Sequence, residues 1–185
     1  DEEGGAFYMT ADDSEQLIVR SKKIHGGAIP SGNAVAAVNL ARLYRYTLKP
    51  NDYRYKELML EIFNTFGGEI AASPSSVPIL LHAVDFHEGP SHEIVISGKA
   101  DSDEVNAMVH ALRTSYLPNK VVILRPEGEE PEIVKFAPLT KGQTSNPGEA
   151  TAYVCIEGAC RLPTTDISKM LELVGANSAA AGSEE

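Results

Sequence analysis

The sequence predicts a mixed α and α/β fold in two parts: a helical segment over residues 1–89 and a small three-layer α/β unit with a mostly parallel sheet over 90–175. Two observations predict this division. From Asn33 to Gly89, apolar residues recur every three or four positions, which is the period of a buried helix face. After His92, short apolar runs of strand length alternate with a helical pattern, as in βαβ units.

The first predicted helix, over Asn33–Leu48, is apolar around most of its circumference. The glycine- and proline-containing loop 24–33 ends in Ser31 and Asn33, two residue types that cap helix N-termini, and Pro50 closes the helix. Before the aromatic end, its polar side chains recur every three residues and share one narrow strip: Asn39, Arg42 and Arg45. We therefore expect burial on nearly all sides, which this chain is too short to supply alone.

Two further helices are expected before Gly89. The segment Tyr53–Phe66 places apolar residues four apart on one broad face. A third helix follows Ser73, with Pro74 in its first turn, where the missing N–H costs little. Residues 1–32 form an irregular lead-in, in which Gln16–Arg20 is the best candidate strand.

The α/β unit begins with a strand over Glu93–Gly98, a helix over Asp101–Ser115 and a second strand over Lys120–Leu124. This order predicts a parallel strand pair with a right-handed crossover. The loop 97–102 lacks the glycine pattern of nucleotide sites, so we expect Asp101 or Ser102 to cap the helix.

The remainder of the unit is less regular. Residues 125–150 are rich in Pro, Gly and Glu, with a candidate strand at Ile133–Phe136. A strand over Thr151–Cys155 and a closing helix over Pro163–Val174 follow. The small, polar tail 176–185 is predicted to be disordered.

Composition limits the class of protein and its partners. Of the residues, 43% are hydrophobic and 23% charged, typical of a chain that folds in water, and the formal net charge is −10. This acidity, without a run of basic residues, argues against nucleic acid as a partner. No apolar stretch reaches the length of a membrane-spanning helix, and the acidic start is no signal peptide, so we expect no membrane partner. Two cysteines cannot staple a domain of this size, so we expect a cytoplasmic location. The start at Asp1 suggests a trimmed chain or a fragment.

Three widely spaced motifs carry a family resemblance. They are Gly27-Ala28-Ile29-Pro30-Ser31-Gly32-Asn33, Leu117-Pro118-Asn119-Lys120, and Ala152-Tyr153-Val154-Cys155 through Cys160 to Pro163, with Thr10–Asp13 and Val19-Arg20 also fitting. In this order they resemble the C-terminal portion of the spermatogenesis-associated protein 20 family, thioredoxin-domain-containing proteins found from bacteria to animals.

The resemblance implies a longer parent protein. It would have an N-terminal thioredoxin-like domain, then an (α/α) toroid like that of sugar epimerases and six-hairpin glycosidases, and a small α/β segment last. On this implication, residues 1–89 are the final helices of the toroid and 90–175 are the α/β segment. The expected partner is then the remainder of the parent chain, with self-association as an alternative. The function of the family is poorly defined.

The residues leading into the first helix are candidates for a binding site. In α/α toroids, loops at one end of the helices line the substrate pocket, and here such a loop carries carboxylates, a histidine and hydroxyl-binding side chains. The candidates are Asp12, Asp13, Arg20, His25, Ser31 and Asn33. Helix capping and turn formation explain the same residue types, and we favour that interpretation.

Cys155 and Cys160 are separated by four residues at the end of a predicted strand. This spacing matches neither the CxxC of zinc sites nor that of redox sites at helix N-termini. We favour two small, half-buried side chains, with a disulfide as the main alternative.

The sequence thus leaves three hypotheses for function. The preferred one is a structural or interaction module without catalysis of its own. The alternatives are part of a carbohydrate-directed enzyme of the epimerase or isomerase type, and a thiol-redox accessory. No cofactor or metal site is expected, because His82, His87 and His92 are better explained by a helix face and a hinge.

Overall fold

The computed structural model describes residues 4–15, 17–128 and 130–176. The chain divides into two compact units, one formed by residues 1–44 and 52–89 and the other by residues 45–51 and 90–185. We refer to them as unit 1 and unit 2 and describe each by itself. No helix in the described ranges has both the length and the apolarity needed to cross a membrane.

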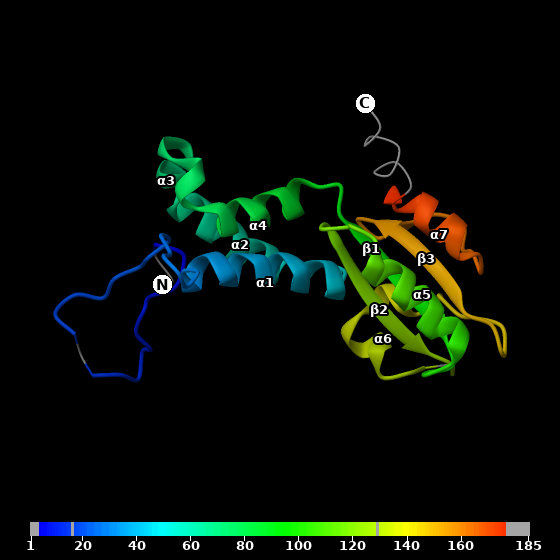
Figure 1. Ribbon diagram of the computed structural model, residues 1–185. Coiled ribbons are helices and arrows are strands. Elements are labelled where there is room, and N and C mark those ends of the chain that lie inside the picture. Colours follow the sequence, from blue (N-terminus) through cyan, green and yellow to red (C-terminus); the bar gives the residue numbers. More distant parts are fainter. Residues whose placement is uncertain (1–3, 16, 129, 177–185) are drawn as a thin grey trace, which may run out of the picture. The chain divides into compact units, whose positions relative to one another are not determined.

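Unit 1 is helical (Figure 1). Its elements are α1 (Gly32–Thr47, whose last residues belong to unit 2), α2 (Arg54–Thr65), α3 (Gly67–Ala72), the 3₁₀ turn η1 (Pro74–Ser76) and α4 (Pro78–Glu88). The first two helices confirm the sequence prediction. The third predicted helix is divided, because Pro74 opens only a 3₁₀ turn and Pro78 starts the helix proper.

Small and apolar side chains form the core of unit 1. They come from α1, α2 and α4: Ala34, Ala37, Leu40, Ala41, Met59, Ile62, Leu80, Ala83 and Phe86. The alanines of α1 allow other elements to approach it closely. Val35 and Leu43, however, each remain 40% exposed on the same helix, so α1 is not covered on all sides within the chain. The predicted strand at 16–20 is wrong for residues 17–20, which are irregular, and Gln16 lies outside the described residues.

Unit 2 contains a four-stranded mixed sheet in the order β2-β1-β3-β4. The strands are β1 (His92–Gly98), β2 (Lys120–Pro126), β3 (Thr151–Ile156) and β4 (Ala159–Cys160). The parallel pairing of β1 with β2 confirms the predicted βαβ arrangement, whose helix is α5 (Asp103–Thr114). Ser102 caps α5 by accepting a hydrogen bond from the Val105 N–H, as expected.

The prediction of a mostly parallel sheet is wrong, since β3 pairs antiparallel with β1 and β4 antiparallel with β3. The register explains the direction of β3. Thr151, the first residue of β3, lies opposite Ser97 near the end of β1, and Ser97 also pairs with Arg125 near the end of β2. The connection 127–150 therefore begins and ends at the same end of the sheet, where β1 and β2 finish. Strand β3 starts there and so runs antiparallel to β1.

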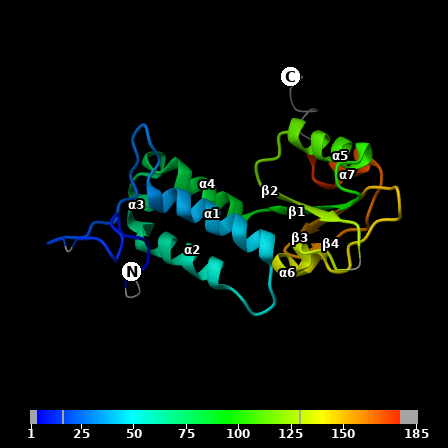
Figure 2. The same cartoon turned by 90° about the horizontal axis from the view of Figure 1, so that it is seen from below.

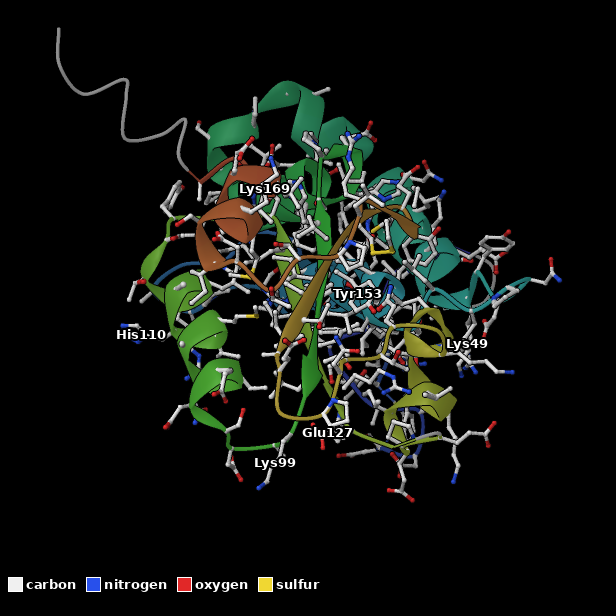
Figure 3. All side chains as sticks on the ribbon, turned by 90° about the vertical axis from the view of Figure 1, so that its right-hand side faces the viewer. Lys49, Lys99, His110, Glu127, Tyr153 and Lys169 are labelled. Carbon is white, nitrogen blue, oxygen red and sulfur yellow. A yellow bond between two sulfur atoms is a disulfide. The ribbon has the colours of Figure 1, made fainter. Side chains whose placement is uncertain are left out.

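The two faces of the sheet are covered differently (Figures 2 and 3). Helices α5 and α7 (Ile167–Leu173) pack on one face around Ile94, Ile96 and Met108, and Figure 3 shows His110 and Lys169 on that side. The other face holds Val95 and Ile123 beneath the 127–150 connection, which contains α6 (Ile133–Phe136) and the 3₁₀ turn η2 (Pro138–Thr140).

Three other expectations for unit 2 need comment. The candidate strand at Ile133–Phe136 is wrong, because that segment forms the short helix α6. The closing helix begins at Ile167 rather than Pro163, with Asp166 as its N-cap. The predicted disordered tail lies outside the described residues, apart from Ala176.

Candidate functional site

The start of α1 is organised by two polar residues that the sequence singled out. The Ser31 hydroxyl accepts a hydrogen bond from the Ala34 N–H at 3.1 Å, which makes it the N-cap. Asn33 is buried and does not cap the helix, and its side-chain amide forms hydrogen bonds to the lead-in, residues 1–32. Its Oδ1 accepts from the Phe7 N–H at 2.8 Å, and its Nδ2 donates to the carbonyls of Phe7 and Lys23 at 2.9 and 3.0 Å.

Arg20 and Asp12 meet within the lead-in. Arg20 Nη2 lies 2.7 Å from Asp12 Oδ1 and also donates to the Thr10 carbonyl at 2.7 Å. The Arg20 guanidinium stacks over the Tyr8 ring, with its central carbon 4.2 Å from the ring centroid. Asp12 is exposed, and so are Asp13 and His25. These contacts are those of an ordered surface loop.

A cavity of about 280 Å³ lies beside the start of α1 in unit 1. Of the six candidate residues, Ser31 alone lines it, so the structure does not gather them around one pocket. The lining is mainly apolar and comes from the 24–34 segment and the start of α4: Ile24, Ala28, Pro30, Ala34, Val77 and Pro78. Ile79 also lines the cavity and is 37% exposed, and on the neighbouring segment Ile29 is 80% exposed and Val35 40%. Ile29 and Val35 do not line the cavity but follow directly after the lining residues Ala28 and Ala34. We call the cavity together with the exposed side chains of Ile29, Val35 and Ile79 the α1 apolar patch.

Cys155 and Cys160 form a disulfide that joins β3 to β4, where the two residues lie directly opposite each other. From the sequence, two unpaired, half-buried side chains were expected. The structure differs because the tight turn at Glu157-Gly158 folds the chain back and places the two cysteines in register. Cys155 is buried and Cys160 is exposed. Gln143 Nε2 lies 3.6 Å from Cys155 Sγ and 3.1 Å from Cys160 Sγ.

Sequence reasoning missed a buried ion pair next to this hairpin. Arg45, expected on the polar strip of α1, is only 3% exposed, and its Nη1 lies 3.2 Å from Glu93 Oε1. The second oxygen of Glu93 accepts from the Gly158 N–H at 3.1 Å. Burial raises the pKa of Glu93, and the Gly158 hydrogen bond and the Arg45 charge oppose that rise. A carboxylate inside an apolar strand was the signal that could have revealed the pair.

The histidines do not converge. His87 lies near Phe63, with ring centroids 6.3 Å apart, and His92 starts β1, where burial lowers its pKa. Among the residues that the structure describes, no group of three or more His, Cys, Asp or Glu side chains has the arrangement of a metal site.

Over 92% of its length, the sequence is similar to curated proteins that share one name. Spermatogenesis-associated protein 20 from Homo sapiens is 30% identical over 171 residues, which cover 92% of this chain and 21% of that protein. The proteins of the same name from Rattus norvegicus and Mus musculus are each 28% identical over 171 residues, with the same coverage. No family model matches the sequence, and no solved structure matches it.

These matches confirm the resemblance to the spermatogenesis-associated protein 20 family. The chain spans about a fifth of the length of the curated relatives it matches.

Proposed function

We propose that this chain is a structural and interaction module of a longer protein of the spermatogenesis-associated protein 20 kind, without catalysis of its own. The observation that carries the proposal is the α1 apolar patch. Ile79 stays exposed on the wall of a cavity with mainly apolar lining. Ile29 and Val35, each next in sequence to a lining residue, are exposed as well, and Val35 lies on a helix that is apolar for most of its circumference.

The patch fits an apolar segment of protein. A cavity of about 280 Å³ accommodates one large apolar side chain with its neighbours. Burying one such side chain stabilises an assembly by about 1.5–3 kcal/mol. The proposed occupant is another segment of the longer protein, because the relatives extend over about five times the length matched here. The family resemblance suggests that this segment belongs to the rest of an (α/α) toroid.

The experiment replaces Val35 with Asp in the 185-residue chain and in the longer protein. We expect the isolated chain to self-associate through the patch and Val35→Asp to make it monomeric in light scattering, since a charge on the patch opposes burial. In the longer protein, Val35→Asp is expected to lower the melting temperature. Asn64→Asp, at an exposed position on α2, is the matched control, since Asn39 is a neighbour of Val35 on the same helix face. A monomeric wild-type chain, together with a longer protein that is indifferent to Val35→Asp, would contradict the proposal.

A thiol-redox accessory is the second candidate function, favoured by the Cys155–Cys160 disulfide. Cys160 is exposed, so a thiol of a partner protein can reach its sulfur. Titration of free thiols in defined glutathione buffers should then show a reversible two-electron transition. A pair that never exchanges with glutathione, with unchanged activity of the longer protein after Cys155→Ser, would reject this function.

A carbohydrate-directed activity stays a prediction. If the longer protein binds or epimerises sugars, His25→Ala is the cleaner test of the loop, because Asn33 also holds the lead-in. Loss of sugar binding in His25→Ala with an unchanged melting temperature would support this activity, and no sugar binding by the intact protein would remove it.

A further inference from the structure

Three polar side chains form one row across the sheet of unit 2, on the face opposite α5 and α7. Ser97 of β1 pairs in register with Arg125 of β2 and with Thr151 of β3. Ser97 is completely buried, Arg125 is 1% exposed and Thr151 is 8% exposed. The row lies where β1 and β2 end, and the carboxyl ends of parallel strands are where α/β sheets place ligands.

Arg125 brings a positive charge into this row. Its Nε donates to the Thr140 carbonyl at 2.9 Å, Nη1 to Pro126 at 3.2 Å and Nη2 to Gly128 at 3.1 Å. Over the described ranges, no ion pair involves Arg125, in contrast to the buried Arg45. A guanidinium has five N–H groups, so two remain for a ligand after these three bonds. The carbonyls fix the orientation of the guanidinium plane.

Two serine hydroxyls in the same region lack partners. The Oγ atoms of Ser97 and Ser145 are buried and make no hydrogen bond to any described residue. Buried hydroxyls are normally satisfied, and each unsatisfied one destabilises the fold unless a water or ligand binds it. Ser145 lines a cavity, so its unpartnered hydroxyl marks a place where polar atoms from outside the chain are accommodated.

Two cavities adjoin the row. One, of about 300 Å³, is lined by Arg125, Glu127, Thr144 and Ser145 among others. The other, of about 510 Å³, shares Thr144 and Ser145 with the first and is lined mainly by hydroxyl and amide groups, which include Asn146, Thr151, Tyr153 and Thr164. Figure 3 labels Tyr153 on β3 and Glu127 just after β2. The Tyr153 hydroxyl donates to the Thr144 carbonyl at 2.6 Å, which ties the shared wall to the sheet.

From this arrangement we infer a binding site for a small hydroxylated carboxylate. The carboxylate lies against the two remaining N–H groups of Arg125 and the Ser145 hydroxyl, because a guanidinium binds a carboxylate in a bidentate manner. The hydroxyl groups of the ligand lie against the threonines and Asn146 of the larger cavity. Glu127 on the lining opposes a second negative charge, which favours a carboxylate over a phosphate dianion.

The test titrates the full chain with gluconate and follows backbone amide NMR shifts and heat of binding. Gluconate carries both features of the proposed ligand, glucose lacks the charge, acetate lacks the hydroxyls and inorganic phosphate carries a different anion. We expect gluconate to bind more tightly than acetate, glucose or phosphate, with shifts in residues 125–128 and 144–151. Equal binding of glucose, tighter binding of phosphate or no binding of gluconate would overturn the inference.

Two variants test the location of the site, and one of them, Ser145→Ala, is not expected to destabilise the fold. Ser145→Ala removes an unpartnered hydroxyl, so we expect an unchanged melting temperature and about fivefold weaker binding, the effect of one lost hydrogen bond. Arg125→Lys should abolish detectable binding if the variant folds. Ser115→Ala is the control, since that hydroxyl bonds within α5 to the Ala111 carbonyl. Gluconate affinity unchanged in Ser145→Ala, or lowered equally in Ser115→Ala, would contradict the site.

Discussion

Arg45 and Arg125 are both buried in unit 2, but the chain compensates their charges in different ways. Arg45 meets Glu93 at 3.2 Å and also lies 3.7 Å from Glu157, whereas Arg125 meets backbone carbonyls. An ion pair removed from water gains little net stability, yet breaking one leaves an uncompensated charge. We therefore expect a large loss in the free energy of unfolding when one partner of the Arg45–Glu93 pair is replaced and the other charge stays buried.

Substitution of either partner should reveal this dependence. Arg45→Met and Glu93→Leu are each expected to lower the free energy of unfolding by about 3–5 kcal/mol, and the double variant by clearly less than the sum. Urea denaturation of the four proteins measures the coupling. Arg42→Met, a half-buried arginine of the same helix, is the control and should cost less than about 1 kcal/mol. Additive single effects would show that the pair is not coupled.

His92, next to Glu93 in β1, makes the free energy of unfolding decrease as the pH falls. Burial lowers its pKa from the ordinary value of 6.5, so the unfolded chain binds this proton more readily than the folded one. The contribution of His92 is then fully present above about pH 6.5 and is lost as the pH falls through its folded pKa. Glu93, whose pKa is raised, has the opposite trend, since the folded state holds its proton more tightly.

The difference between wild type and His92→Gln isolates the histidine. Urea denaturation at about pH 7.5, 6.5 and 5.5 should show a smaller loss of stability on acidification in His92→Gln than in wild type. Equal losses in the two proteins would mean that burial does not perturb His92.

At the scale of elements, Asn33 connects the lead-in to α1. Its side-chain amide makes three hydrogen bonds to residues 7 and 23 and is nearly fully buried. A local capping role, which the sequence suggested, would have involved only neighbouring residues. Asn33 instead fixes two segments that are 26 and 10 residues away in the sequence.

Asn33→Ala should therefore loosen the lead-in before the helices. We expect a loss of about 2 kcal/mol in the free energy of unfolding, from several hydrogen bonds of about 1 kcal/mol each. Limited proteolysis should cut within residues 8–23 much faster than in wild type. Asn39→Ala, exposed on the same helix, is the control. Equal cleavage of the two variants would refute the role assigned to Asn33.

Element prediction succeeded where local chemistry decides the structure. Prolines, N-caps and apolar periodicity locate α1, α2 and α5 to within a residue or two, and continuous apolar runs locate β1 and β2. It failed where residues distant in the sequence decide the structure. The direction of β3 depends on the path of residues 127–150, and the burial of Arg45 depends on Glu93, 48 residues away.

The candidate site was predictable only in part for the same reason. The loop before α1 does border a cavity, and the lining of that cavity is mainly apolar. The polar residues Arg20, Ser31 and Asn33 form hydrogen bonds or ion pairs with other parts of the chain. Ser97 and Arg125 belong to two strands whose pairing sets them side by side, and no local motif announces that register. The sequence does not indicate that the hydroxyl groups of Ser97 and Ser145 lack hydrogen-bond partners.

At the scale of the molecule, we propose that the chain is a module that another segment completes. Relatives about five times as long as the matched segment and an apolar patch on α1 support this view. Such a patch on an isolated chain favours self-association, whereas the proposal predicts that another segment covers it in the longer protein.

The accessibility of Val35 in the two contexts tests this claim most directly. In a Cys155→Ser/Cys160→Ser background, Val35→Cys is labelled with a thiol reagent in the isolated chain at low concentration and in the longer protein, with the exposed Arg113→Cys as the reference. We expect position 35 to react many times more slowly in the longer protein and position 113 to react at the same rate in both. Equal rates at position 35 would contradict the proposal.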